Sequence, residues 1–383
     1  MNFDITEDQI AIRDAVREFC AAEFAAHAAR WDAEGAVPRE AVDKLASQGY
    51  LGMAIPEEWG GLGWDSRTVT LVVEEIARVS AALAIMIAVH NSVGAYPIYR
   101  FGTDEQRKRF LPRLVSSDCG AFSLSEPGAG SDAAGLDSSA VLQGDHYVLN
   151  GSKNWVTNGI HAWTYTLFAK TDKTAGHRGI TAFIVERDTP GLVIGKPEDK
   201  MGLRGSDTVA LSLQDLKVPL TQRLGAEGEG FKIAMSVLDT GRIGVAAQAI
   251  GVMQAAFEEA VRYAQQRQAF GGPLSRIQAV QFKLAEMERR IQGARLLMRR
   301  AAWLKDMGRP FTREASMAKL HASEAATWVT HQAIQVHGGY GYVKEYAVER
   351  FYRDARVMEI YEGASEIQRL VIARSLLKDG VAV

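Results

Sequence analysis

The sequence predicts an α+β protein of several domains, in which a helical block, a β block and a second helical block follow one another. The chain has 383 residues, which is more than one hydrophobic core usually covers. Apolar residues recur every three or four positions near both ends, whereas they alternate in the middle. We therefore expect an N-terminal α-helical domain over residues 1–115, a middle β-domain over 116–225 and a C-terminal four-helix bundle over 226–383.

The first block begins with a helix whose start is marked by Thr6 and Gln9, which are spaced as a capping box. Ile12 and Val16 then follow at helical spacing. The longest apolar run, residues 81–89, is less than half of the roughly 20 residues that a membrane-spanning helix needs. This run predicts a buried helix and no membrane insertion.

Charge and cysteine content narrow the class of protein further. Lys and Arg number 44 against 46 Asp and Glu, a net charge of −2, which argues against nucleic acid as a partner. Cys20 and Cys119 are too few for a disulfide framework and fit buried thiols in a reducing compartment. Acidic Asp4 and Glu7 are unlike a mitochondrial transit peptide, so we expect a cytoplasmic, bacterial protein.

The middle block carries β-type alternation. Tyr147 and Leu149 alternate, Asn150-Gly151 predicts a tight hairpin turn, and Trp155 follows on the return strand. Further strands are predicted at residues 165–169, 180–185 and 209–213. Short strands bounded by Gly, Pro or Asp are typical of a small antiparallel sandwich or barrel.

The last block returns to helical spacing after a predicted linker at residues 225–230. About four long helices are expected, over residues 231–267, 277–301, 315–336 and 365–377. The third of these carries mostly small side chains on its apolar face, so it can approach its neighbours closely. The pattern predicts a four-helix bundle.

Several familiar sites are missing from the sequence: the nucleophile elbow of serine hydrolases, His-Glu-x-x-His, paired Cys-x-x-Cys and the phosphate loop. His90 and His337 lie in apolar surroundings, where a structural role is favoured over catalysis or metal binding. We expect no metal site.

Two glycine-rich segments and one charged pair leave alternatives open. Residues 125–132 lack the dinucleotide-binding spacing and form either an ordinary loop or a place where backbone N–H groups face a ligand. Residues 337–342 predict a helix end, and spacing does not decide whether these glycines also admit a pyrophosphate. Asp239 and Arg242 form either a solvated ion pair or a ligand contact.

Glu362 precedes the last predicted helix, where Ser365 or Glu366 would serve as an ordinary capping residue. A carboxylate on a loop between two bundle helices can be held in a cleft without competing for backbone hydrogen bonds, as a general base requires. From spacing alone, an ordinary loop carboxylate is the simpler interpretation.

Taken together, these segments resemble the acyl-CoA dehydrogenase family over nearly the entire chain. The segments that match its signatures are residues 125–132, 155–159, 201–206, 267–271, 335–339 and 361–369. Residues 238–244 resemble the short-chain, butyryl-type members most. The resemblance implies the helical, β, helical order, an FAD between the β-domain and the bundle, and a homotetramer.

The resemblance also implies the site residues. Flavin contacts in the β-domain are implied for Phe122, Leu124, Ser125, Gly130, Ser131, Trp155, Val156 and Thr157. Cofactor contacts in the bundle, some across a subunit boundary, are implied for Arg267, Phe270, Gln278, Gln335, Gly338, Gly339, Ser365 and Glu366. Substrate contacts are implied for Ser131, Asp239, Arg242 and Gly363.

By the same resemblance Glu362 is the general base, which takes the α-proton of an acyl-CoA thioester while hydride leaves the β-carbon for the flavin. The Glu362 backbone N–H and a ribityl hydroxyl would bind the carbonyl oxygen, and bound substrate should raise the pKa of Glu362. Some members carry the base at the position of Gly241, which has no side chain here. Ala364 and Ser125 stand where Thr is common, which leaves flavin affinity and potential open.

Three functions follow from the resemblance. The first is an FAD-dependent dehydrogenase that makes trans-2-enoyl-CoA and passes electrons to an electron-transfer flavoprotein. The second is an oxidase of the same fold that uses dioxygen, and the third is a non-catalytic acyl-CoA-binding scaffold. Residues 90–97 are expected to contribute to the floor of the acyl pocket. Chain length, branching and a carrier-protein thioester are left open by the sequence.

Overall fold

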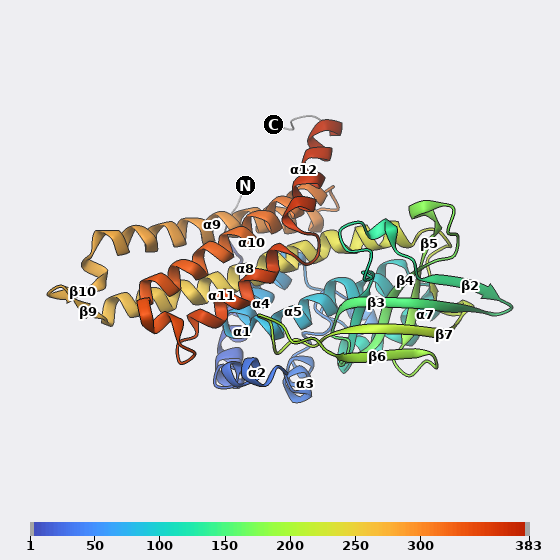
Figure 1. Ribbon diagram of the computed structural model, residues 1–383, viewed down its shortest axis with the longest axis horizontal. Coiled ribbons are helices and arrows are strands. Elements are labelled where there is room, and N and C mark those ends of the chain that lie inside the picture. Colours follow the sequence, from blue (N-terminus) through green and yellow to red (C-terminus); the bar gives the residue numbers. More distant parts are fainter. Residues whose placement is uncertain (1–3, 380–383) are drawn as a thin grey trace.

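The computed structural model describes residues 4–379 of an elongated molecule, with a β-sheet at one end and a long helical bundle running to the other (Figure 1). The predicted helical, β, helical order is confirmed. The first helices are α1 (Glu7–Glu23), α2 (Ala28–Glu34), α3 (Arg39–Ser47), α4 (Ser66–Val79), α5 (Ala81–Val89), α6 (Tyr96–Phe101) and α7 (Asp104–Ser116). The capping box is present, because the Thr6 hydroxyl accepts from the Gln9 backbone N–H and Gln9 Oε1 accepts from the Thr6 N–H.

Helix α5 lies inside the protein, as its apolar run predicts. Every residue from Ala81 to Val89 is buried. The continuous helical stretch Ala81–Phe101 is long and apolar enough to cross a membrane, yet 94% of its most apolar window is buried by the rest of the chain. Burial of this kind is what a core helix of a folded domain shows.

The strands of the middle block belong to one mixed sheet. They are β1 (Cys119–Ser123), β2 (Ser139–Gln143), β3 (His146–Thr157), β4 (Ala162–Lys170), β5 (Ile180–Glu186), β6 (Leu192–Pro197), β7 (Thr208–Pro219) and β8 (Arg223–Leu224). Among the described residues the sheet runs in the order β6-β7-β3-β2-β4-β5-β8 without closing, and β1 pairs with β4 in parallel. Strand β2 also meets β4 in parallel, at Ser139 and Lys170, so the expectation of a purely antiparallel sheet is wrong at both contacts with β4.

The predicted hairpin turn at Asn150-Gly151 is also wrong. The chain turns at Gly144 and Asp145, and β3 then continues straight through Asn150 to Thr157, so Trp155 lies on the same strand. Pairing between β3 and β7 shifts register at this point, and Asn150 instead bonds Asp215 of β7. Gly151 is needed because a Cβ there would lie 2.3 Å from Ser138 Oγ.

The bundle contains the four expected long helices and a short one. They are α8 (Gly230–Gln266), α9 (Gln278–Asp306), α10 (Thr312–His337), α11 (Val348–Arg356) and α12 (Ser365–Asp379), with a small hairpin of β9 (Gln268–Ala269) and β10 (Gly272–Pro273) at the end of α8. One hydrophobic core runs through both helical blocks, since α4 and α5 pack against α8. A Cβ at Gly251 would lie 2.2 Å from the Glu74 carbonyl oxygen, so α4 and α8 touch closely.

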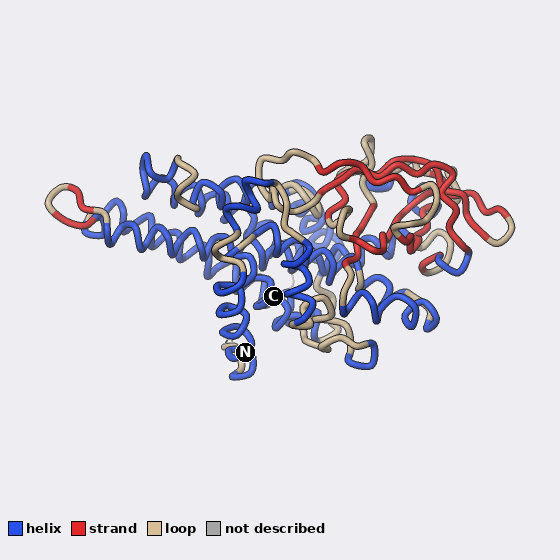
Figure 2. Tube along the Cα trace, turned by 90° about the horizontal axis from the view of Figure 1, so that it is seen from below, coloured by secondary structure: helices blue, strands red, loops and turns tan. Residues whose placement is uncertain are grey.

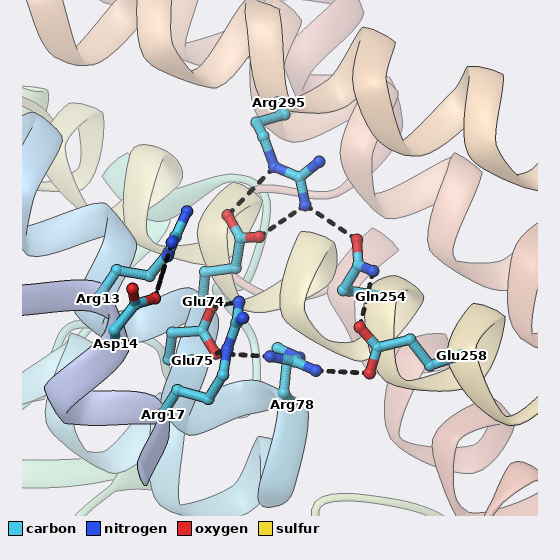
Figure 3. Close-up of polar contacts among 9 residues, drawn as sticks. All are labelled: Arg13, Asp14, Arg17, Glu74, Glu75, Arg78, Gln254, Glu258 and Arg295. Atoms are coloured by element: carbon cyan, nitrogen blue, oxygen red, sulfur yellow. Dashed lines mark hydrogen bonds and ion pairs between the residues drawn. The ribbon is translucent and has the colours of Figure 1, made fainter. Parts of the chain in front are cut away.

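A buried ionic network also joins the two helical blocks (Figure 3). Glu75 on α4 accepts hydrogen bonds from Arg17 of α1 and from Arg78, and Glu74 pairs with Arg295 of α9 at 2.7 Å. Both carboxylates are almost fully buried. Buried charges need such partners, so this network fixes the orientation of α1 and α4 on the bundle.

Candidate active site

Glu362 lies on the short loop between the 3-10 turn η8 (Val357–Glu359) and α12. Its backbone has φ +50°, a left-handed conformation that costs a non-glycine residue about 1–3 kcal/mol. The following carbonyl, that of Gly363, accepts from Lys319 Nζ of α10 at 2.7 Å and from Gln368 Nε2 of α12 at 2.8 Å. The strained loop is therefore tied to two helices.

The Glu362 carboxylate points at Gly241 of α8. A Cβ at Gly241 would lie only 2.0 Å from Glu362 Oε2, so this position accepts glycine alone while the carboxylate stays in place. Glu362 Oε2 is buried without a hydrogen-bond partner among the described residues. Burial raises the pKa of Glu362 to about 7, although the charges of Lys319 and Arg242 lower it. A carboxyl that ionises near neutral pH is suited to general base catalysis.

Asp239 and Arg242 form an ion pair on α8, next to Gly241, in which Arg242 is buried and Asp239 is partly buried. Arg242 Nη1 lies 2.6 Å from Asp239 Oδ1, and Arg242 is only 5% exposed. Burial raises the pKa of Asp239, while Arg242 and the hydroxyl of Thr312 lower it. The solvated ion pair considered from the sequence is therefore wrong, because the pair lies inside the protein and its arginine acts on Glu362.

A cavity lies beside the same stretch of α8. Its lining includes Ala88, Asn91, Ser92, Tyr96, Thr240, Gly244 and Lys305. Lys305 Nζ donates to Ser66 Oγ at 3.0 Å and lies 5.1 Å from the centre of the Tyr96 ring. Three lining residues fall in the segment 90–97 that was expected to form a pocket floor. His90 itself is buried between the Leu51 carbonyl and the Gly120 N–H, as its structural role predicts.

The β-domain presents a second held loop, residues 123–132. Glu126 accepts from the backbone N–H groups of Asp137 and Ser138, and its Oε1 lies 2.7 Å from Lys153 Nζ of β3. Lys153 also donates to the Leu124 carbonyl at 3.3 Å. These contacts fix the base of the loop. Its tip carries Gly130, where no atom lies within 4 Å of the position that a Cβ would take.

The flavin residues expected in the β-domain divide into exposed and buried ones. Gly130, Ser131 and Trp155 are exposed, and Ser125, Phe122 and Thr157 are partly exposed. Leu124 is 7% exposed and Val156 is fully buried, so little or none of their surface is open to a ligand. Trp155 is 63% exposed at φ +62° and offers a large open ring face.

The bundle residues expected to hold the rest of the cofactor lie at the opposite end of the molecule, around the β9–β10 hairpin (Figures 1 and 2). This exposed set is Arg267, Phe270, Gln278, Gln335, Gly338 and Gly339. Arg267 stacks on Tyr340 beside His337, which packs on Tyr263. Phe270 is 97% exposed at the hairpin. One chain brings this set together but holds it away from the β-domain.

Ser365 and Glu366 begin α12, immediately after the Glu362 loop. Ser365 is buried, and its hydroxyl oxygen has no hydrogen-bond partner among the described residues. Glu366 is exposed and makes a long contact of 3.9 Å with Arg369. Gly363, expected near the thioester, supplies the carbonyl that ties the loop down.

Sequence reasoning missed three residues of this site: Lys153, Lys319 and Gln368. All three side chains are buried and hold the two loops. A signal existed for Lys319, because it lies beside the run of small residues on the apolar face of the third long helix. A charged residue in such surroundings is rare unless it is paired.

Comparison with known proteins agrees with this fold and loop arrangement. Models of the acyl-CoA dehydrogenase N-terminal, middle and C-terminal domains match residues 6–118, 121–216 and 228–377. The bovine mitochondrial short-chain specific acyl-CoA dehydrogenase is 49% identical over 376 residues, which cover 98% of this chain and 91% of that protein. The chain therefore belongs to the acyl-CoA dehydrogenase family of oxidoreductases.

Solved structures are similar over the whole chain as well. Butyryl-CoA dehydrogenase from Megasphaera elsdenii matches with a TM-score of 0.97 and 46% identity, covering 99% of this chain and all of that one. A chain from a study of the electron transferring flavoprotein of Acidaminococcus fermentans, concerned with flavin-based electron bifurcation, matches with a TM-score of 0.98 and 46% identity, at the same coverage.

Proposed function

We propose that this protein is an FAD-dependent dehydrogenase that converts a short acyl-CoA thioester to trans-2-enoyl-CoA, with Glu362 as the general base. The observation that carries this proposal is the Glu362 carboxylate itself. It lies against Gly241, one of its oxygens is buried without a partner among residues 4–379, and burial raises its pKa to about 7. A structural carboxylate would have its hydrogen bonds satisfied.

The chain's own residues account for proton removal. The Glu362 carboxylate takes the proton from the α-carbon of the thioester, and hydrogen bonds to the thioester carbonyl oxygen stabilise the enolate that develops. The backbone N–H of Glu362 is the donor that the family resemblance assigns to this oxygen. FAD, when bound, accepts the hydride from the β-carbon.

The residues present fit an FAD. The open ring face of Trp155 and the space around Gly130 suit a flat ring system against the β-domain. The partnerless hydroxyl of Ser365 suits a polar ligand atom next to the Glu362 loop. At the far end, Gly338 and Gly339 also have open space where a Cβ would lie, which suits a close approach of pyrophosphate.

Anaerobic substrate addition tests the proposal. The purified protein should carry flavin absorbance, and butyryl-CoA should bleach it. Glu362→Gln should keep the flavin and lose about 10³-fold to 10⁴-fold in turnover, because the amide cannot accept the α-proton. A flavin that butyryl-CoA leaves unbleached in the wild-type protein, or a Glu362→Gln variant with near-normal turnover, would contradict the proposal.

A short acyl chain is favoured by the cavity beside Gly241. Its lining includes Lys305, whose ammonium group donates to Ser66 Oγ, and packing a long alkyl chain against a charged group is unfavourable because the chain offers no hydrogen bond. The expected substrates are therefore acyl groups near butyryl in length. Rates with acyl-CoAs of increasing length and branching would measure this preference.

The separation of the cofactor residues supports an oligomer. The exposed set around β9–β10 lies at the end of the bundle far from the β-sheet, whose strand β3 carries Trp155, so we infer that a single FAD contacts both sets only where two copies share it (Figures 1 and 2). This separation supports an assembly of at least two copies, and the assignment of four copies follows the family resemblance. Sedimentation of the yellow protein at several concentrations would test it.

The electron acceptor is assigned as an electron-transfer flavoprotein, following the family resemblance. No feature of residues 4–379 favours the oxidase alternative. The yield of hydrogen peroxide in air distinguishes an oxidase from a dehydrogenase. The reduced flavin of an oxidase passes its electrons to dioxygen, whereas that of a dehydrogenase requires the flavoprotein acceptor.

A further inference from the structure

Lys319 is a buried lysine for which the proposed chemistry has no role. It lies on α10 among small residues, and its side chain is inaccessible to solvent. Burying an ammonium group is costly unless the group is paired and hydrogen-bonded. Its recorded hydrogen bond goes to the Gly363 carbonyl, at 2.7 Å, which is the residue next to Glu362.

The turn that Lys319 holds is an unusual one. Glu362 and Gly363 both have left-handed backbones, with φ +50° and +92°. Two donors converge on the Gly363 carbonyl, the charged Lys319 from α10 and the neutral Gln368 from α12. A strained turn persists only when its surroundings fix it, so these donors hold the conformation that aims Glu362 at Gly241.

The charges around this turn come from several elements. Glu362 faces Lys319 of α10 and Arg242 of α8. Lys319 in turn faces Glu362, Arg242, Glu359 of η8 and Glu366 of α12. Glu359 is bonded by the Thr327 hydroxyl, and Arg242 is paired with Asp239. Among the described residues Glu362 is thus a carboxylate with no ion-pair partner of its own, beside the buried cation Lys319.

We propose that Lys319 is a positioning residue for the Glu362 base: it clamps the 362–363 turn through the Gly363 carbonyl and keeps a positive charge beside the carboxylate. This inference rests on the proposed function of Glu362. The clamp sets where the carboxylate points, and the charge sets how readily it ionises.

The pKa directions agree with this geometry. Burial lowers the pKa of Lys319 to about 8, and the Glu362 charge raises it, so the lysine stays largely protonated at pH 7. In return the Lys319 charge lowers the pKa of Glu362, against the larger effect of burial. Removing the cation should therefore leave Glu362 protonated to a higher pH.

Three variants of the FAD-loaded enzyme separate charge from clamp. Lys319→Met loses both, Lys319→Arg keeps the charge, and Gln368→Leu removes the neutral donor to the same carbonyl. We expect Lys319→Met to lower kcat about tenfold or more and to move the acidic limb of the kcat profile up by about one pH unit. Lys319→Arg should leave the limb in place, and Gln368→Leu should lower kcat without moving it.

One further measurement and one further variant complete the test. Infrared difference spectra of the Glu362 carboxyl, with Glu362→Gln as the blank, should show the same upward shift without relying on turnover. Lys319→Gln, which retains a donor but no charge, replaces Lys319→Met if the latter does not fold. The inference would be overturned if Lys319→Met or Lys319→Gln folds, binds flavin, and keeps the wild-type acidic limb of the kcat profile and the wild-type titration of the Glu362 carboxyl. Failure of the wild type to oxidise any acyl-CoA would instead remove the proposed function.

Discussion

Two loops in this protein each place a buried lysine beside a glutamate, and they use the pair in opposite ways. In the β-domain, Lys153 lies 2.7 Å from Glu126, whose oxygens also accept backbone N–H groups. In the bundle, Lys319 bonds a carbonyl while Glu362 keeps one buried oxygen without a partner. The pKa of Glu126 is lowered by Lys153 and its hydrogen bonds despite burial, whereas burial raises the pKa of Glu362.

The difference shows how to tell a structural carboxylate from a chemical one. A carboxylate that holds a fold has its lone pairs occupied and stays ionised. A carboxylate that must accept a proton from a ligand needs a free oxygen and a pKa near the working pH. Glu126 and Glu362 both lie beside a buried lysine, so the neighbouring residue does not distinguish them. The number of hydrogen-bond partners on each carboxylate oxygen does.

Breaking the β-domain pair should give the largest effect on stability. Glu126→Gln leaves Lys153 as a buried, unpaired charge, so the free energy of unfolding should fall by about 3–5 kcal/mol. Denaturant unfolding with flavin release as a second probe measures it. The double variant with Lys153→Met should recover part of the loss, and an unchanged midpoint in Glu126→Gln would show that the pair does not hold this loop.

A methyl group at Gly241 should disturb the bundle loop. Its Cβ would lie 2.0 Å from Glu362 Oε2, so Gly241→Ala displaces the base, and kcat should fall about 100-fold. Gly293→Ala on α9 is the matched control, because its Cβ would meet the His321 ring, 3.2 Å from Nε2, and neither Glu362 nor the cavity lining. Equal effects of the two substitutions on single-turnover flavin reduction would argue against the assigned position of the base.

The cavity next to the bundle loop offers a smaller effect. Lys305→Met removes the ammonium group from the lining, and the ratio of kcat/KM for octanoyl-CoA to that for butyryl-CoA should rise about tenfold. Lys283→Met, on the same helix but bonded to Gln332 elsewhere, serves as control. A ratio that stays constant in Lys305→Met would mean that this cavity does not receive the acyl chain.

The smallest expected effect is a pH-dependent shift in Tm. The pKa of Glu362 is raised from 4.5 to about 7 in the folded protein, so the stability it contributes is fully present below about pH 4.5 and is lost as pH rises through 7. Glu362→Gln avoids this loss and should raise Tm by about 2 °C at pH 8.5. At pH 5 the two melting curves should nearly coincide, and an equal rise at both pH values would point to a different cause.

The sequence predicts the order of blocks well because hydrophobic spacing is a local property. Helices α8, α9, α10 and α12 begin and end within a few residues of the expected limits. The predicted turn at Asn150-Gly151 is wrong because the glycine is required for another reason: Ser138 packs so closely that a Cβ at position 151 would clash, and the chain does not reverse there. The parallel pairing of β1 with β4 depends on residues 43 apart in sequence, such as Cys119 and Ala162, which no local pattern reports.

Only some residues of the candidate active site could be predicted from the sequence. Glu362 was identified through the family resemblance, and spacing alone favoured an ordinary loop carboxylate. Lys153 and Lys319 were missed because lysine is among the residues least often buried, so its presence in an apolar pattern is first taken as a surface position. The contact between Glu362 and Gly241 joins a loop to helix α8, 121 residues apart in sequence, so only the fold reveals it.

The distance along the bundle between the β9–β10 hairpin and the sheet has a thermodynamic consequence. If one FAD bridges two copies, FAD binding and subunit association are coupled equilibria, and each strengthens the other by mass action. Dilution should then release FAD from the protein as the copies separate, and added FAD should reduce the fraction of separated copies. A single chain would then hold only half of the FAD site, and both FAD binding and catalysis would require a second copy.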